Sequence, residues 1–247
     1  MSAIRIGTSG WVYKDWKGPF YPAEVKAKDQ LAYYATRFTT TEINGSFYRL
    51  PSEAAVAGWA GPAPPGFVYA WKASRFITHN KKLKDVGDSI ALVFGRMDPL
   101  GEHFGPVLFQ LPPQLRADYE RLAGFLRLLP RHRRCTVEFR HPNWYAPAIL
   151  DLLREHDVAL CVSDHAAAPS PWEATASFLY VRGHGPSGRY FGRYDEARLE
   201  DWAGRIAAFP GEAYAYFDND IKSAAPADAD RLVALTARLA PGRVRRP

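Results

Sequence analysis

The sequence predicts an α/β protein with a single-domain TIM-barrel-like (β/α)8 fold over residues 1–247. Eight short apolar runs alternate with segments whose apolar residues recur at helical spacing. Strands that alternate with helices pair in parallel through right-handed crossovers. Eight such units in 247 residues match a TIM barrel, whereas a doubly wound sheet usually has fewer strands and a Gly-rich phosphate turn, which this sequence lacks.

The expected strands are short apolar runs of the kind that forms a buried parallel sheet. They cover residues 4–9, 38–43, 67–72, 106–111, 135–140, 158–164, 177–183 and 214–219.

The expected helices lie between these runs, at residues 28–37, 52–60, 83–97, 117–129, 146–156, 195–208 and 227–239. In 117–129, for example, Leu122, Phe125, Leu126 and Leu129 recur at helical spacing. The link between the sixth and seventh runs, AAAPSPWEATA, contains no convincing helix. Because no linker or shift in composition divides the chain, we expect one domain that ends in a basic tail at about 241–247.

The composition is that of a soluble globular protein, with 47% hydrophobic and 23% charged residues. No run approaches the ~18 apolar residues of a membrane helix, and no secretory signal is visible, so we expect a cytoplasmic protein without membrane contacts. The two cysteines, Cys135 and Cys161, lie in or beside apolar runs. We therefore expect two buried thiols rather than a disulfide or a zinc site.

The net charge of +6 is matched by two basic runs, RHRR at 131–134 and the C-terminal Arg243, Arg245 and Arg246. Charge runs of this kind are more often solvated faces than binding sites. We interpret them as solvated faces and keep nucleic-acid binding as the alternative. The sequence does not indicate an oligomeric state.

Polar residues gather where the expected strands end. If the larger apolar set, such as Ile43, Phe109, Val137 and Phe139, faces the helices, the alternating positions face the barrel interior. Those positions hold Thr8, Glu42, Asn44, Lys72, Gln110, Glu138, Arg140, Asp164, Arg182, His184 and Asp218. Because TIM barrels place their active sites at the C-terminal ends of the strands, this set predicts a ligand site there. The alternative is a structural network of ion pairs.

The residue types in this set indicate roles. Glu42, Glu138 and Asp164 are candidates for general acid–base chemistry or for a divalent metal, which is an alternative and not a prediction. Lys72, Arg140 and Arg182 fit an anionic group, although a lysine at a strand end can also form a Schiff base. His79, just after the third strand, is a ligand, a general base or a loop cap.

Several longer stretches resemble the YecE-like family, also catalogued as domain of unknown function 72. They include GTSGWVYKDWKGPFYP (7–22), FTTTEINGSFYRLPS (38–52), YAWKASRFITH (69–79), GPVLFQLPP (105–113), TVEFRHPNWY (136–145), YVRGHG (180–185) and YFDND (216–220). The resemblance spans nearly the whole chain and implies a TIM-barrel-like fold with a shared polar pocket, but no established activity.

The family's motif positions correspond here to Glu42, Asn44, Phe47, Tyr48, Lys72, His79, Gln110, Glu138, Arg140, Trp144, Arg182, His184 and Asn219. One departure is visible: the family usually reads YFNN where this chain has Phe217-Asp218-Asn219-Asp220. The extra carboxylates change the charge expected at the end of the eighth strand.

Three functions fit these residues. The first is a hydrolase or lyase acting on a phosphorylated or nucleic-acid ligand, with aromatics available to stack bases: Trp11, Tyr13, Trp16, Phe47, Tyr48 and Trp144. The second is a carbohydrate-active enzyme, which is weakened because Gln110 and Arg182 stand where common barrel glycosidases carry carboxylic acids. The third is a non-catalytic module that binds an anionic ligand. We favour the first.

Overall fold

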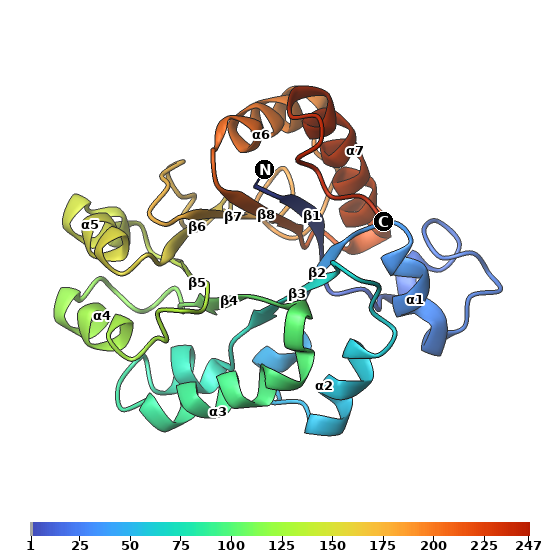
Figure 1. The fold of residues 1–247 in the computed structure, drawn as a ribbon. Coiled ribbons are helices and arrows are strands. Elements are labelled where there is room, and N and C mark those ends of the chain that lie inside the picture. The colour runs from blue at the N-terminus through green and yellow to red at the C-terminus, as the bar shows by residue number, and fades with distance from the viewer. Residues whose placement is uncertain (1) are drawn as a thin grey trace.

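The computed structural model describes residues 2–247, in which eight parallel strands close a barrel in chain order (Figure 1). The strands are β1 (Ile4–Ser9), β2 (Thr40–Ile43), β3 (Val68–Lys72), β4 (Phe104–Gln110), β5 (Cys135–Glu138), β6 (Ala159–Ser163), β7 (Phe178–Gly183) and β8 (Glu212–Phe217). The TIM-barrel-like fold and the parallel pairing are therefore confirmed.

Helices surround the barrel (Figure 1). They are α1 (Gln30–Ala35), α2 (Glu53–Ala60), α3 (Gly87–Met97), α4 (Tyr119–Leu126), α5 (Pro147–Glu155), α6 (Glu196–Ala208) and α7 (Ala224–Leu239). Short 3-10 turns occupy Lys14–Trp16, Ala27–Asp29, Gly45–Phe47, Asp98–His103, Pro142–Tyr145 and Ile221–Ser223, and a π turn occupies Phe76–Asn80.

The link between β6 and β7 contains no helix, as expected, so an irregular segment covers the barrel at residues 164–177. Its Trp172 meets Trp202 of α6 at a ring-centroid distance of 5.9 Å. This aromatic contact packs the irregular segment against α6, where a helix would otherwise cover the strands.

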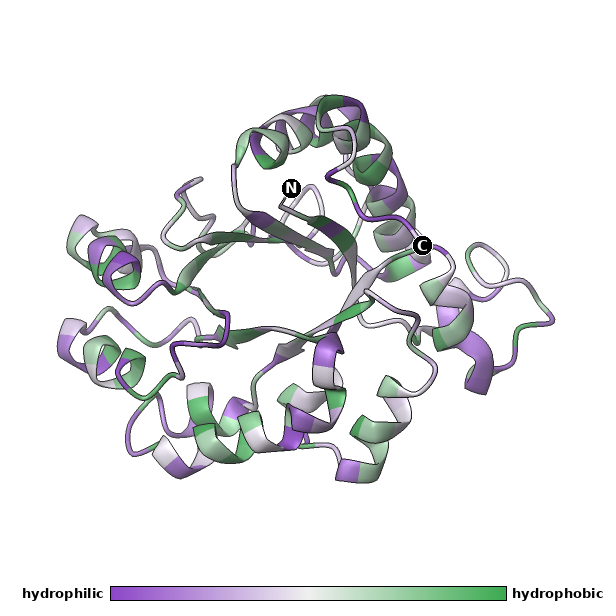
Figure 2. Ribbon diagram, viewed as in Figure 1, coloured by the Kyte–Doolittle hydropathy of each residue, from purple (hydrophilic) through white to green (hydrophobic). Residues whose placement is uncertain are grey.

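Two apolar layers follow from the alternation along the strands. Ile43, Phe109, Val137 and Phe139 pack in the larger layer between strands and helices, which confirms their predicted face. Figure 2 shows the strands largely green, while the helices carry both colours. Inside the barrel lies a smaller apolar cluster, composed of Val68, Ala70, Leu108, Ala159, Cys161, Phe178, Tyr180, Tyr214 and Tyr216. This inner cluster is the floor on which the polar strand ends rest.

Both cysteines are buried free thiols, as expected, and burial raises the pKa of Cys135 to about 12. No helix in residues 2–247 is long and apolar enough to cross a membrane.

The basic runs are partly bound into the fold. The guanidinium of Arg243 donates to the carbonyl oxygens of Ala207, Phe209 and Gly211 at 2.8–2.9 Å. In the other run, Arg133 pairs with Asp98, and Arg134 forms a further ion pair. Part of the expected tail at 241–247 and part of RHRR therefore serve structure.

Candidate functional site

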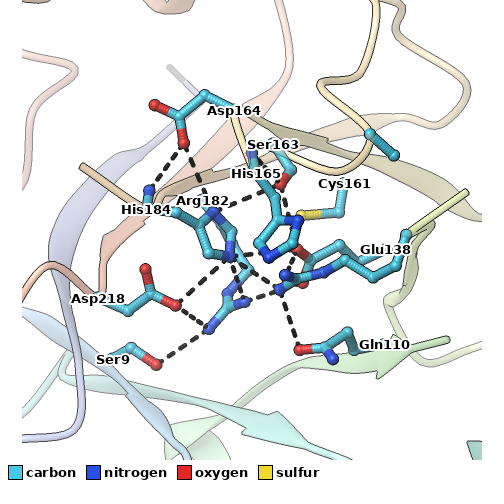
Figure 3. Close-up of polar contacts among 12 residues, drawn as sticks. Ser9, Gln110, Glu138, Cys161, Ser163, Asp164, His165, Arg182, His184 and Asp218 are labelled. Carbon is cyan, nitrogen blue, oxygen red and sulfur yellow. Dashed lines mark hydrogen bonds and ion pairs between the residues drawn. The ribbon is translucent and has the colours of Figure 1, made fainter. Parts of the chain in front are cut away.

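Arg182 is the centre of a buried group of charges above the apolar floor (Figure 3). Its side chain is fully buried. Its two terminal nitrogens lie 2.8 Å from Glu138 Oε2 and 2.8 Å from Glu42 Oε1, and 3.0 Å separates Nη2 from Asp218 Oδ2. A buried guanidinium is costly unless it is paired in this way. Burial works against the charge, but the three carboxylates outweigh it and raise the pKa of Arg182 well above its usual value.

Glu138 and Arg140, two residues apart, do lie on one face. Glu138 Oε1 is 2.7 Å from Arg140 Nη2 and accepts a hydrogen bond from Ser163 Oγ at 3.1 Å. Burial alone would raise the pKa of Glu138, but Arg140 and Arg182 hold it well below its usual value. Arg140 also donates to Gln110 and Tyr190, at 3.1 and 2.9 Å. Glu138 is therefore an ionised and fully engaged carboxylate.

Glu42 is equally engaged. Besides Arg182, it accepts hydrogen bonds from the hydroxyl groups of Tyr180, at 2.6 Å, and Ser9. Burial opposes its charge, but Arg182 and Lys72 lower its pKa. Both carboxylate oxygens therefore have partners within the protein.

His184 joins the same group. Its Nε2 lies 3.3 Å from Glu138 Oε1 and 3.4 Å from Asp218 Oδ2, and its Nδ1 lies 3.5 Å from Asp164 Oδ1. Burial lowers its pKa, but Asp218 and Glu138 more than compensate, so the net shift is upward. We call this group the ionic cluster; it consists of Glu42, Glu138, Arg140, Arg182, His184 and Asp218.

A cavity of about 390 Å³ opens at the mouth of the barrel. We call it the mouth cavity; its lining comprises Asn44, Phe47, Tyr48, Lys72, His79, Gln110, Tyr190, Asp218, Asp220 and Ile221. It shares Asp218 with the ionic cluster, so a bound ligand would meet charges whose positions the cluster fixes.

Lys72 is the cation of this lining. Its Nζ lies 4.5 Å from the centre of the Phe47 ring. The ion pairs among residues 2–247 do not include Lys72. Burial, with Arg182, lowers its pKa to about 8, against the opposing carboxylates. Lys72 is thus a positively charged group held near, but not paired with, the carboxylates.

Three oxygens around the mouth cavity are buried and lack hydrogen-bond partners within residues 2–247: Oδ1 of Asn44, Oδ1 of Asp218 and Oδ1 of Asp220. Asp218 is only 5% exposed. Burial and the neighbouring Asp218 raise the pKa of Asp220 to about 8, so its carboxyl group is largely protonated at neutral pH. Unsatisfied buried acceptors are costly, and here they are arranged for a ligand to satisfy them.

Two aromatic residues and a histidine complete the rim. His79 lies on the π turn with its ring 5.0 Å from that of Phe47, and burial lowers its pKa to about 4, which leaves it neutral. Tyr48 is 71% exposed. These side chains offer flat, uncharged surface at the entrance.

The backbone beside the cavity is strained. Tyr190, Lys222 and Ser223 have φ angles of 68°, 56° and 57°, in the left-handed region that side chains larger than glycine avoid. Such strain tends to gather at ligand sites, where the surrounding structure enforces it.

Most predicted site residues meet at this end of the barrel. Five of them line the mouth cavity, namely Asn44, Tyr48, Lys72, His79 and Gln110. Another five, Glu42, Glu138, Arg140, Arg182 and His184, belong to the ionic cluster. Trp144 and Asn219 belong to neither. Trp144 is buried, stacks on Phe139 and donates from Nε1 to the carbonyl of Leu115 at 2.7 Å. Asn219 donates to Asp228 at 2.8 Å, on the side of α7.

The interior face predicted for Thr8 and Asp164 is wrong. Thr8 Oγ1 bonds the hydroxyl of Tyr34 in α1 at 2.9 Å, and Asp164 accepts from Tyr194 and from the backbone of His184. The interior positions belong to their neighbours, Ser9 and Ser163. The signal was present: Thr8 continues the outward-facing apolar set of Ile4 and Ile6, as Asp164 continues that of Leu160 and Val162.

Sequence reasoning named Asp220 only as an extra carboxylate after the eighth strand and missed Tyr190, because both follow strand ends at a distance that alternation does not cover. Within residues 2–247, no group of three or more His, Cys, Asp and Glu side chains is arranged to hold a metal ion.

Comparisons with known proteins agree with the fold. A family model described as "Protein of unknown function DUF72" matches residues 5–245. The UPF0759 protein YunF of Bacillus subtilis (strain 168) is 26% identical, over 81% of this chain and 81% of its own. The crystal structure of a DUF72 family protein from Thermotoga maritima has a TM-score of 0.86 at 26% identity and covers 94% of this chain and 98% of its own. A DUF72 family protein from Enterococcus faecalis, at 19% identity, 94% and 95% coverage and a TM-score of 0.79, shares the fold.

Proposed function

The chain belongs to the DUF72 family, and we propose that it is an enzyme, a hydrolase or lyase, that acts on a phosphorylated ligand in the mouth cavity. The observation that supports this is the meeting, in one cavity, of an unpaired lysine with a protonated aspartic acid. A cation and a proton donor are what cleavage of a phosphate ester needs.

Lys72 is the group that binds the phosphoryl oxygens. It is a point charge at a strand end with no carboxylate of its own, so an anionic ligand satisfies it. Arg140 and Arg182 are unsuited to direct phosphate binding, because carboxylates already neutralise them and their guanidinium groups are buried. We assign them, with Glu42 and Glu138, to holding the mouth residues in position.

Asp220 is the acid. In hydrolysis, water adds to phosphorus, the bond from phosphorus to the leaving oxygen breaks, and the Asp220 carboxyl gives its proton to that oxygen. The proton lost by the water then returns to the Asp220 carboxylate. A pKa of about 8 keeps this group protonated at neutral pH while leaving it able to give up the proton.

The carbohydrate alternative has less support, because the ends of β4 and β7 carry Gln110 and Arg182. A non-catalytic binding module would bind the same ligand but would not convert it, so a measurement of turnover distinguishes it from the proposed enzyme.

The test is hydrolysis of p-nitrophenyl phosphate, together with calorimetric binding of inorganic phosphate, for wild type, Asp220→Asn and Lys72→Gln. Lys84→Gln is the control, an exposed lysine away from the mouth cavity. We expect Asp220→Asn to lower kcat about 100-fold or more with phosphate affinity retained. Lys72→Gln should weaken phosphate binding about tenfold.

Phosphate binding that is absent, or unaffected by Lys72→Gln, contradicts the proposal. Binding that depends on Lys72 without turnover of this or other phosphomonoesters indicates the non-catalytic module.

A further inference from the structure

A second cavity, of about 370 Å³, adjoins the mouth cavity. We call it the aromatic cavity; it is lined by Gly10, Trp11, Val12, Tyr13, Ile43, Asn44, Gly45, Ser46, Arg49, Pro51 and Trp59. Asn44 lines both cavities, so the two spaces border on the same side chain. Nothing in the proposed chemistry uses this second space.

The walls of the aromatic cavity fit a flat, largely apolar group. Trp11 and Trp59 meet edge to face, with ring centroids 6.0 Å apart and planes at 88°. Both are only partly buried, so ring surface remains uncovered. Ile43 and Pro51 add aliphatic surface. Aromatic rings are the usual partners of such walls.

Two polar features make a purely apolar occupant, such as an acyl chain, a poor match. Asn44 Oδ1 is buried and has no hydrogen-bond partner, so it calls for an N–H or O–H donor. Arg49 is the charged side chain of the lining and is exposed. Its guanidinium can stack on a ring or donate to a ring acceptor. A heteroaromatic ring with donors and acceptors on its edge satisfies both.

We infer that the aromatic cavity is a nucleobase subsite, and that the ligand of the whole mouth is a nucleotide whose phosphate lies at Lys72. This inference rests on the proposed function, since it joins the base to the phosphate assigned there. The set of features agrees with a nucleotide: the amide of Asn44 lines both the ring cavity and the cavity that holds the cation Lys72.

The chain offers a variant that changes the lining of the base subsite and not that of the mouth cavity. Gly45 is exposed, lacks the left-handed φ that would forbid a side chain, and a Cβ added to it meets no atom within 4 Å. Gly45→Leu therefore adds a side chain to the lining of the cavity without a backbone clash. Gly95→Leu is the matched control, because Gly95 of α3 is equally exposed and open but lies outside both cavities.

The experiment is calorimetric binding of nucleoside 5′-monophosphates, ribose 5-phosphate and inorganic phosphate to the full chain and its variants. We expect the best nucleotide to bind about tenfold or more tightly than ribose 5-phosphate. Gly45→Leu should abolish that gain while leaving ribose 5-phosphate affinity unchanged, and Gly95→Leu should change neither. If Gly45→Leu fails to fold, Trp11→Leu, which removes one ring wall, provides the same test.

Equal affinity for nucleotide and ribose 5-phosphate, or a gain that survives both variants, overturns the base subsite. If ribose 5-phosphate binding still depends on Lys72, the proposed function stands without it. If no phosphate compound binds, both ideas fail.

Discussion

At the scale of single residues, the mouth cavity brings the pKa values of two different groups to the same region. Burial, with Asp218, raises that of Asp220 from 3.8 to about 8, and burial, with Arg182, lowers that of Lys72 from 10.5 to about 8. In each case burial penalises the charged form of the side chain, and this penalty causes the pKa shift. The two groups therefore impose opposite pH dependences on stability in adjoining windows.

Between pH 3.8 and about 8, the folded state holds a proton on Asp220 that the unfolded state has lost. The free energy of unfolding therefore falls as the pH rises through this window. The full shift corresponds to about 6 kcal/mol, and water in the open cavity reduces it. We expect Asp220→Asn to remove a loss on the order of 2 kcal/mol, measured by urea unfolding at pH 5 and pH 8.5.

Between about pH 8 and 10.5, the unfolded state holds the proton that folded Lys72 has lost, so stability rises with pH. Lys72→Met should flatten this second window and leave the first unchanged. Parallel curves for wild type and both variants would show that neither group is shifted as described.

Glu138 differs from Asp220 and Lys72 because its charged form is favoured: the carboxylate balances two guanidinium groups. We expect Glu138→Gln to lower the free energy of unfolding by about 3–5 kcal/mol, because it leaves buried positive charge without a partner. Chemical denaturation checks this. Glu173→Gln, which breaks an exposed ion pair with Arg154 at 2.8 Å, should cost less than about 1 kcal/mol.

The spacing of Glu138 and Arg140 was enough to predict their shared face, because strand periodicity is local. The pKa of Asp220 was beyond reach, because it depends on Asp218 and on the burial produced by loops from elsewhere in the chain. For the same reason, alternation could not show that Arg140 and Arg182 were already neutralised.

At the scale of elements, the sequence predicted the order of strands and helices better than their ends. The helix expected from residue 83 begins only at Gly87, because Lys82, Leu83 and Asp85 have φ angles of 50–70°, which no α-helix accommodates. The expected fifth strand ends at Glu138 rather than at residue 140. The spacing of apolar residues predicts the central part of a helix or strand, whereas contacts with the rest of the fold determine the residue at which it ends.

The turn between β8 and α7 carries a testable strain. Lys222 is exposed, with φ 56° and ψ 32°. Because left-handed backbone costs a lysine about 1–2 kcal/mol and glycine nothing, Lys222→Gly should raise the free energy of unfolding by up to about 1 kcal/mol.

Lys84→Gly supplies the comparison for that variant. Lys84 is an exposed lysine without a positive φ, so glycine there should only add freedom to the unfolded chain and lower stability. Equal losses in the two variants, measured by thermal unfolding, would argue against strain at Lys222.

At the scale of the whole molecule, the two ends of the chain meet beside β1. Ile4 N donates to Arg243 O at 2.8 Å, and Arg245 N donates to Ile4 O at 2.9 Å. We expect Arg243→Ala to lower the free energy of unfolding by about 2 kcal/mol, because four carbonyl oxygens, including that of Ser2, lose a charged donor. Arg246→Ala, with no such bonds among the hydrogen bonds of residues 2–247, should be neutral by the same denaturation assay. Similar losses for both variants would assign the effect to net charge.

The position of Arg182 in β7 has a consequence for the way the chain acquires its fold. Glu42 leaves the ribosome 140 residues before the guanidinium that compensates it, and Tyr180, its other strong partner, also comes late. A nascent chain that stopped short of β7 would have to bury Glu42 with Lys72 nearby but without the guanidinium that pairs with it, which is unfavourable. We therefore expect half-barrels to be penalised during synthesis, and the barrel to close in one late cooperative step rather than strand by strand.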